Sequence, residues 1–117
     1  MSHSECLFCK IITGKIPAEK IAETPQLLVI KDAKPKAPTH FLIMPKKHIV
    51  TMADVSNRDK DLAFAMFVMV EELAKKLDAP QAFNIISNNG AEAGQSIHHM
   101  HWHFLSGKNI YQGGFEL

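Results

Sequence analysis

Alternating histidines near the carboxyl end constrain the fold of this chain more than any other feature. From His99 onward the sequence reads His-Met-His-Trp-His-Phe. Successive side chains of a β-strand point to opposite faces, whereas a helix would scatter these histidines around its circumference. The alternation therefore predicts a strand from His99 to Leu105. Its apolar face would carry Met100, Trp102 and Phe104, and its histidine face would carry His99, His101 and His103.

The histidine face allows two kinds of chemistry. A metal ion is one option, because neutral imidazole is the commonest side-chain ligand. Phosphate chemistry is the other, since imidazoles serve as nucleophile, acid and hydrogen-bond donor. The polar loop before the strand, residues 88–96, favours phosphate because its glycines let backbone N–H groups approach an anion closely. Its polar side chains are Asn88, Gln95 and Ser96.

The remaining pattern predicts a single domain, residues 1–117, of mixed α and β structure. A long amphipathic helix follows a Ser56 N-cap and ends near Asp78, and a short helix covers Cys6 to Thr13. Strands are expected at Lys20–Glu23, Leu27–Lys31, Thr39–Met44, Ala82–Ser87 and His99–Leu105. Asp32 to Pro38 contains two prolines in four residues, which indicates a rigid loop. With only one long helix, an α+β fold with an antiparallel sheet fits better than parallel winding.

The charge balance excludes several classes of partner. The chain has 13 basic and 12 acidic residues, so its net charge is +1. This balance gives no electrostatic footprint for nucleic acid or an anionic membrane, and any phosphate must be held by a few placed groups. The longest apolar run, Leu62 to Val70, is too short to span a bilayer, which takes about 20 residues. No secretion signal is recognised before Cys6, so we expect a cytoplasmic protein.

The chain's two cysteines, Cys6 and Cys9, are spaced as C-x-x-C. In a reducing compartment this spacing indicates a metal site or a redox pair more than a structural disulfide. A thioredoxin-like redox motif follows a strand, and no strand is expected before Cys6. A closed zinc site needs four ligands, and the seven histidines offer candidates for the other two.

Three blocks of the sequence resemble the histidine triad (HIT) superfamily. Residues 94–105 are similar to its signature, in which three histidines alternate with apolar residues. Residues 37–48, which include His40 and His48, resemble its upstream block, and the opening Cys6–Ile12 with Ile16–Pro17 matches as well. The similarity extends to about Gly107 and points to the Hint-like branch of nucleoside phosphoramidate or nucleotidyl hydrolases.

This resemblance implies a five-stranded antiparallel sheet with one short and one long helix, and a homodimer in which two sheets form a ten-stranded one. It implies cleavage of a purine nucleoside 5'-phosphoramidate, or a related nucleotidyl adduct, at the α-phosphorus. His101 would be the nucleophile and form a nucleotidyl-histidine, from which water releases a nucleoside monophosphate. His103 would donate to a phosphate oxygen, His40 would stabilise the charged state, and Ser96 would hydrogen-bond near the leaving group. Since no Walker lysine or acidic metal cluster is present, we expect no magnesium requirement.

The resemblance also implies the residues that bind the nucleotide and a structural zinc ion. The apolar base pocket would be lined by Phe8, Ile11, Ile16 and Ile30. Asp32 would accept the ribose hydroxyls, and Asn88 and Gln95 would contact phosphate. Zinc would be held by Cys6, Cys9, His48 and His99, so that His99 would have a structural part only.

Three positions depart from the family's pattern. Ala33 is small where an aliphatic wall of the base pocket is expected, Trp102 is bulkier than the usual aliphatic residue, and His98 replaces an aromatic or small residue. Three other functions remain as alternatives to the phosphoramidase. They are a diadenosine polyphosphate hydrolase with the same nucleophile, a nucleotide-binding regulatory module with incidental turnover, and a metal-binding protein whose histidine row holds the ion.

Overall fold

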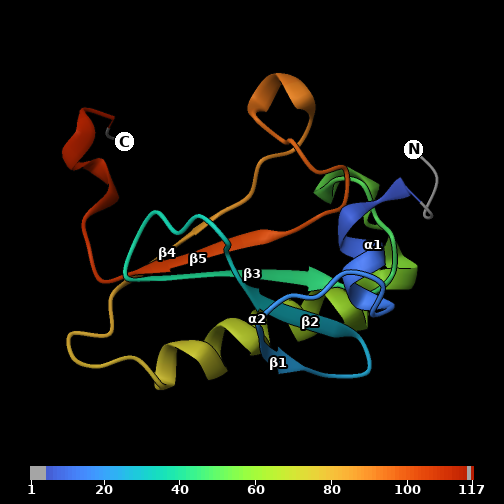
Figure 1. The fold of residues 1–117 in the computed structure, drawn as a ribbon, viewed down its shortest axis with the longest axis horizontal. Coiled ribbons are helices and arrows are strands. Elements are labelled where there is room, and N and C mark those ends of the chain that lie inside the picture. The colour runs from blue at the N-terminus through green and yellow to red at the C-terminus, as the bar shows by residue number, and fades with distance from the viewer. Residues whose placement is uncertain (1–4, 116) are drawn as a thin grey trace.

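One five-stranded antiparallel sheet organises the computed structural model, which describes residues 5–115 and 117 (Figure 1). The strands are β1 (Lys20–Glu23), β2 (Leu27–Lys31), β3 (Thr39–Pro45), β4 (Phe83–Ile86) and β5 (Trp102–Ser106). Their order is β1-β2-β3-β5-β4, so the last strand of the chain lies between β3 and β4. Every pairing is antiparallel. The predicted α+β fold with a five-stranded antiparallel sheet is confirmed.

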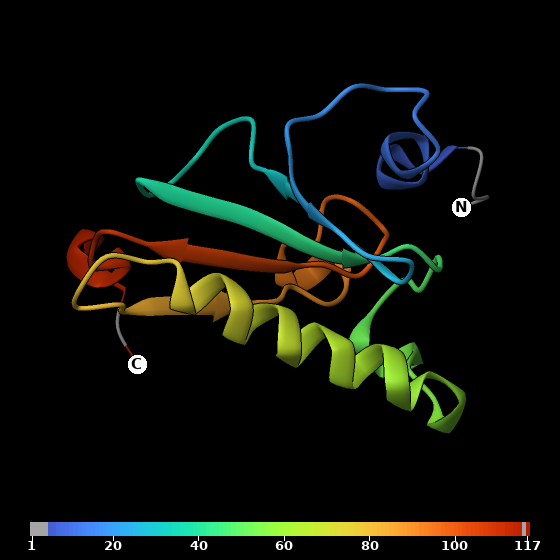
Figure 2. The same cartoon turned by 90° about the horizontal axis from the view of Figure 1, so that it is seen from below.

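Two helices cover opposite faces of this sheet (Figure 2). The short helix α1 (Leu7–Ile12) lies on one face, and the long helix α2 (Lys60–Lys75) runs along the other. Alternate residues of β2 divide between the two cores. Leu27 and Val29 join the core beneath α2, and Leu28 and Ile30 join the core beside α1. A slip of one residue in the register would exchange these two sets, so burial on both faces fixes the register.

The long helix begins and ends differently from its sequence prediction. Ser56 caps a short 3-10 turn, Asn57–Asp59, through a capping box with Asp59, and α2 starts only after that turn. At the other end the hydrogen bonds tighten, because Leu77 N donates to Ala74 O, and the regular helix ends at Lys75 rather than near Asp78. The core face of α2 carries Leu62, Met66, Met69 and Leu73. Among the residues that the structure describes, no helix has the length and apolar character needed to cross a membrane.

The histidine-bearing strand starts later than the alternation predicts. β5 begins at Trp102, because Met100 N donates to Ile49 O at 2.6 Å and residues 99–101 leave the sheet ladder. The predicted start at His99 is therefore wrong. The alternation of faces nevertheless persists through the irregular segment, since Met100, Trp102 and Phe104 all lie in the core beneath α2. The other predicted helix and strand bounds agree with the structure to within one residue.

Candidate active site and metal cluster

Four of the predicted metal ligands converge beside α1. Cys6 is the N-cap residue of that helix, and Cys9 follows one turn later. Cys6 Sγ lies 3.4 Å from His99 Nδ1, and Cys9 Sγ lies 3.3 Å from His48 Nδ1. The four ligand atoms lie within 4.8 Å of one another. Two sulfurs and two imidazole nitrogens form a donor set that suits tetrahedral zinc.

Hydrogen bonding prepares the His99 ring for a metal ion. Its Nε2 lies 2.7 Å from the Pro45 carbonyl oxygen, which can only accept, so Nε2 carries the proton. Nδ1 therefore presents its lone pair to the two thiols, as is common for metal-binding histidines. Burial, together with the neighbouring Cys6, raises the pKa of the Cys9 thiol to about 11, so a metal ion must displace the thiol protons. The residues fit a structural zinc ion, which would cross-link α1 to His48 and His99.

His101 is held in one tautomer by the backbone. Its Nδ1 lies 2.7 Å from the His99 carbonyl oxygen, so Nδ1–H donates and Nε2 keeps its lone pair. The ring is buried, and its centroid lies 4.9 Å from that of Phe8 in an edge-on contact. Burial lowers the pKa of His101, an effect that the His99 hydrogen bond opposes in part. The ring is therefore neutral at pH 7.

A second network joins His40 on β3 to His103 on the neighbouring β5. The Lys36 N–H donates to His40 Nδ1 at 3.0 Å, so the proton of neutral His40 sits on Nε2. That Nε2 lies 2.9 Å from His103 Nδ1 and 3.5 Å from the Asp32 carboxylate. His103 consequently carries its own proton on Nε2. Burial lowers the pKa of His40, and burial together with the nearby His101 and His40 lowers the pKa of His103 to about 4.

Two adjoining cavities flank these histidines. The larger cavity has a volume of about 1010 Å³ and is lined by the predicted base-pocket residues Phe8, Ile11, Ile16 and Ile30, together with Ser96. The smaller cavity, of about 420 Å³, is lined by His40, His103 and Asn88 among others. Asp32 and Lys36 line both cavities. The His101 ring lies between the cavities, next to Phe8 on one side and 5.1 Å from the His103 ring on the other.

Comparison with known proteins identifies the family. The family model described as the HIT domain matches residues 13–110. The chain belongs to the HIT family. It is 37% identical over 101 residues to a HIT-like protein of Chlamydia trachomatis, a match that covers 86% of this chain and 91% of the relative. A HIT-like protein of Synechocystis is 36% identical over 104 residues, which cover 89% of this chain and 91% of the relative.

Solved HIT structures have the same fold over nearly the whole chain. A HIT family hydrolase from Legionella pneumophila matches with a TM-score of 0.85 at 38% identity, covering 90% of this chain and 95% of that one. A histidine triad protein from Clostridium difficile also gives a TM-score of 0.85, at 36% identity, with 93% and 96% covered. The resemblance inferred from the three sequence blocks is therefore confirmed at the level of the family and its fold.

Gln95 has a structural task in this HIT protein. Its Nε2 donates to the carbonyl oxygens of Val50, at 2.7 Å, and Ile97, at 3.1 Å. Its Oε1 accepts from the Gly90 N–H at 2.8 Å, and the residue is only 3% exposed. These bonds hold the 88–96 loop against the segment that follows β3. Because both amide hydrogens are already used, Gln95 positions the loop in this conformation.

Sequence reasoning missed the backbone groups that set the tautomers of this HIT site. The Lys36 N–H acts on His40 and the Pro45 carbonyl acts on His99, although neither residue type reveals such a role. The nearest signal was the proline-rich loop, because a rigid loop holds a backbone N–H at a fixed point. The side chains of Lys36 and Lys108 on the smaller cavity were missed as well.

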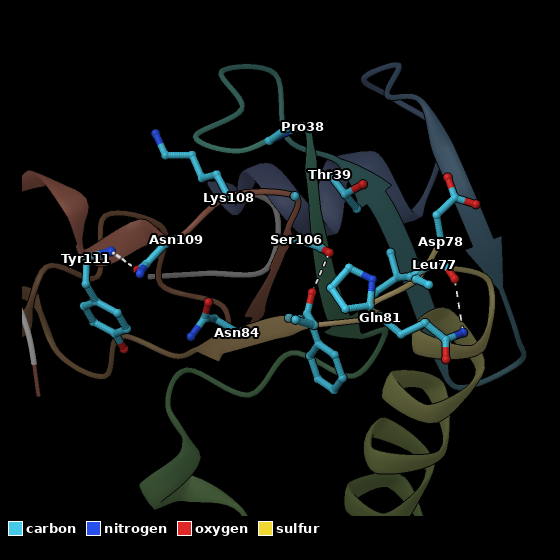
Figure 3. A pocket seen from close by; sticks show the side chains of 15 residues that line it. Pro38, Thr39, Leu77, Asp78, Gln81, Asn84, Ser106, Lys108, Asn109 and Tyr111 are labelled. Atoms are coloured by element: carbon cyan, nitrogen blue, oxygen red, sulfur yellow. Dashed lines mark hydrogen bonds between the residues drawn. The ribbon is translucent and has the colours of Figure 1, made fainter.

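No histidine lines a third cavity, which has a volume of about 730 Å³ (Figure 3). It is lined by residues of the turn between α2 and β4, by Thr39, and by the segment after β5. Ser106 Oγ closes part of its wall by donating to the Ala82 carbonyl oxygen at 2.6 Å. No predicted site residue lines it. The predicted catalytic and nucleotide-binding residues that line a cavity therefore all lie at the other two.

Proposed function

We propose that this HIT protein is a hydrolase that cleaves a purine nucleoside 5'-phosphoramidate, or a related nucleotidyl adduct, at the α-phosphorus. The similar HIT family hydrolase of Legionella pneumophila supports the hydrolase class. The observation that carries the proposal is the setting of His101. The His99 carbonyl oxygen holds its Nδ1–H, which leaves Nε2 as a nucleophile between the apolar cavity and the His103 ring.

The proposed reaction has two displacements at phosphorus. In the first, His101 Nε2 forms a bond to the α-phosphorus while the bond to the leaving group breaks, and the leaving group takes a proton from solvent beside the Ser96 hydroxyl. In the second, water attacks the nucleotidyl-histidine and gives its proton back to solvent, the nitrogen–phosphorus bond breaks, and a nucleoside monophosphate leaves. One water is consumed in total. The covalent intermediate divides one difficult step into two easier ones.

The histidine pair beside the nucleophile supplies charge stabilisation. His103 Nε2–H is oriented as a donor because its Nδ1 accepts from His40. A donor placed where negative charge develops on a transferring phosphoryl group is the main source of catalysis in such reactions. In this proposal His40 acts through His103, and Asn88 on the smaller cavity contacts a phosphate oxygen.

The larger cavity is the proposed nucleoside pocket. Phe8, Ile11, Ile16 and Ile30 give it an apolar wall that suits the flat face of a purine base. Asp32 sits where both cavities meet, and its Oδ1 already accepts from the Lys34 N–H at 2.8 Å, so its position is fixed. A carboxylate held there would accept hydrogen bonds from the ribose hydroxyls.

Intact-protein mass spectrometry during turnover of an adenosine phosphoramidate tests this function. Wild type is expected to gain the mass of one adenylyl group, and His101→Ala is expected to gain none while it still binds adenosine monophosphate. The neighbouring His98→Ala variant serves as the control, because His98 lies outside the described network, and it should gain the adduct like wild type. Turnover by His101→Ala at the wild-type rate would refute the assignment.

The smaller cavity favours a second class of substrate, in which the leaving group is an anion. Lys36 and Lys108 both line it, and its volume of about 420 Å³ adjoins the nucleoside pocket at Asp32 and Lys36. A dinucleoside polyphosphate uses the same nucleophile and leaves as a charged phosphate. Turnover of diadenosine polyphosphates alongside amine-leaving phosphoramidates, compared by kcat/KM, distinguishes the two activities.

We infer three further properties from the same set of residues. The cysteine–histidine cluster suits a structural zinc ion, and its free thiols suit the reducing cytoplasm. A homodimer is supported by the outer edge of β4, which pairs with no other strand in the described part of the chain. Phe83 and Ile85 on that strand are exposed apolar side chains, and so is Phe67 on α2, whose ring packs against Trp102 of the neighbouring β5. Two copies paired through β4 would form a ten-stranded sheet.

A further inference from the structure

His99 takes part in both the cysteine–histidine cluster and the hydrogen bond to His101. Its ring lies in the cysteine–histidine cluster, where Nδ1 is 3.4 Å from Cys6 Sγ and 3.6 Å from Cys9 Sγ. Its backbone carbonyl oxygen lies 2.7 Å from His101 Nδ1 and sets the tautomer of that ring. The residue is completely buried in a close-packed interior, so a shift of its ring is passed on to its backbone and its neighbours. One residue thus connects the cluster to the proposed nucleophile.

Phe8 forms a second connection between the same two places. It lies between the two cysteines in the sequence and is buried on the inner side of α1. Its ring contacts His101 edge-on, with centroids 4.9 Å apart, and His99 in the same way at 5.9 Å. A cross-link through both cysteines would fix α1, and with it the aromatic wall against which His101 packs.

The cluster opens on a cavity of its own. A space of about 290 Å³ is lined by Cys9, His48, Thr13 and three lysines, and it shares no lining residue with the large cavity beside Phe8. A metal ion or a chelator can therefore reach Cys9 without entering the nucleoside pocket. A metal ion in the cluster and a substrate in the nucleoside pocket would therefore not block each other.

We propose that His99 is a positioning residue that couples the cysteine–histidine cluster to His101. A metal ion bound to the His99 ring would fix the His99 backbone carbonyl, and that carbonyl keeps the proton of His101 on Nδ1 and leaves Nε2 free. The proposal rests on the proposed function only in taking His101 as the nucleophile. Without the ion, the thiols and imidazoles are joined by contacts of 3.3 to 3.6 Å, which are much weaker than metal bonds. The carbonyl then loses its fixed place, the other His101 tautomer becomes populated, and the reactive fraction falls.

The test follows the full chain with zinc bound, after zinc removal by a chelator, and after zinc is restored. Three quantities are measured on each sample: bound zinc, the ¹⁵N–¹H NMR correlations that report the His101 tautomer, and kcat and KM for an adenosine phosphoramidate. We expect the Nδ1–H tautomer to dominate with zinc, to mix with the other tautomer without it, and to return on reloading. In parallel kcat should fall by about 10-fold or more, which is the range seen when the support of a metal site is lost.

Variants make the same comparison without a chelator. Cys9→Ser removes one thiolate ligand and should lower the affinity of the cluster for zinc. It should therefore reproduce the tautomer mixture and the kcat of the zinc-free chain. Lys15→Ala is the matched control, because the exposed Lys15 lines that cavity without being a ligand, and it should behave as wild type. Should zinc removal unfold the chain, His48→Ala keeps three ligands and tests the proposal in a folded protein, where an intermediate tautomer population is expected.

Two results separate this proposal from the function on which it rests. The proposal is overturned if the zinc-free chain stays folded, keeps the His101 tautomer, and has a kcat within about twofold of wild type. A twofold change in kcat corresponds to less than about 0.5 kcal/mol in activation free energy, which is no more than an ordinary surface substitution causes. The second result is a His101 tautomer population that changes with zinc in a chain that cleaves neither phosphoramidates nor polyphosphates. It would support the coupling between the cluster and His101, and it would refute the hydrolase assignment.

Discussion

His40 Nε2 lies 2.9 Å from His103 Nδ1, and the Lys36 backbone N–H on the far side of His40 decides which of the two nitrogens carries the proton. The direction of the whole chain of hydrogen bonds follows from that one donor. His40 must donate, His103 must accept, and the remaining proton of His103 must sit on Nε2. A backbone group outside the histidine row thereby makes His103 a donor toward the proposed phosphate site.

Replacing His103 tests this donor role. His103→Ala removes the N–H and should lower kcat by roughly 100- to 1000-fold, as for other single donors that stabilise developing charge. His103→Gln keeps an amide N–H at a similar reach and should lose markedly less, with KM little changed in both variants. Steady-state kinetics on an adenosine phosphoramidate give the comparison. Equal losses in the two variants would mean that hydrogen-bond donation is not the contribution of His103.

Acid should destabilise the fold by protonating His40 and His103. The folded pKa of His103 is about 4, whereas an unperturbed histidine has a pKa of about 6.5, so the unfolded chain binds more protons between these values. The stability from His103 is therefore complete above about pH 6.5 and is lost as the pH falls toward 4, and the lowered pKa of His40 acts in the same direction. Urea unfolding at several pH values should show a shallower acid slope for His103→Gln than for wild type. An unchanged slope would contradict the burial of a neutral His103.

The sheet and its family were accessible from sequence because they depend on patterns of side-chain type. Leu27–Lys31 is a run of branched apolar residues, and the structure places β2 at those bounds. The start of β5 was not accessible, since it depends on the bond from Met100 N to Ile49 O, which joins segments far apart in the chain. Backbone hydrogen bonds of this kind have no signature in residue identity.

The candidate site shows the same division. The spacing of Cys6 and Cys9 and the alternation of the histidines are visible in the sequence, and the structure brings Cys6, Cys9, His48 and His99 together. The assignment of each proton depends on the carbonyl oxygens of Pro45 and His99 and on the Lys36 N–H. Gln95 is a related case: a polar residue in a glycine-containing loop suits phosphate contact or loop bracing equally well, and only the fold shows its three hydrogen-bond partners.

A charge on α2 should weaken the proposed dimer. Phe67 is 65% exposed and packs edge-on against Trp102 of β5, with ring centroids 5.1 Å apart. β5 pairs with β4, the strand that would pair with a second copy. Phe67→Glu should raise the dimer dissociation constant by about 10-fold or more, because a buried unpaired charge costs more than 1.4 kcal/mol. Sedimentation velocity over a range of concentrations measures it. Met52→Glu is the control, as Met52 is an exposed apolar residue outside α2 and β4. Equal dissociation constants for wild type and Phe67→Glu would exclude this face from the interface.

Filling the nucleoside pocket at position 33 should tighten substrate binding. Ala33 lines the larger cavity opposite the residues of α1 and is small where the HIT resemblance leads us to expect an aliphatic wall. Ala33→Ile adds three carbon groups, of which one or two would be buried against a purine base. Each fully buried group is worth about 0.8 kcal/mol, so KM should fall by about 4- to 15-fold. Because the contact is the same in substrate and transition state, kcat should stay unchanged. Ala93→Ile, an equally exposed alanine outside both cavities, should leave KM unaltered. A rise in KM for Ala33→Ile would place the base elsewhere than beside residue 33.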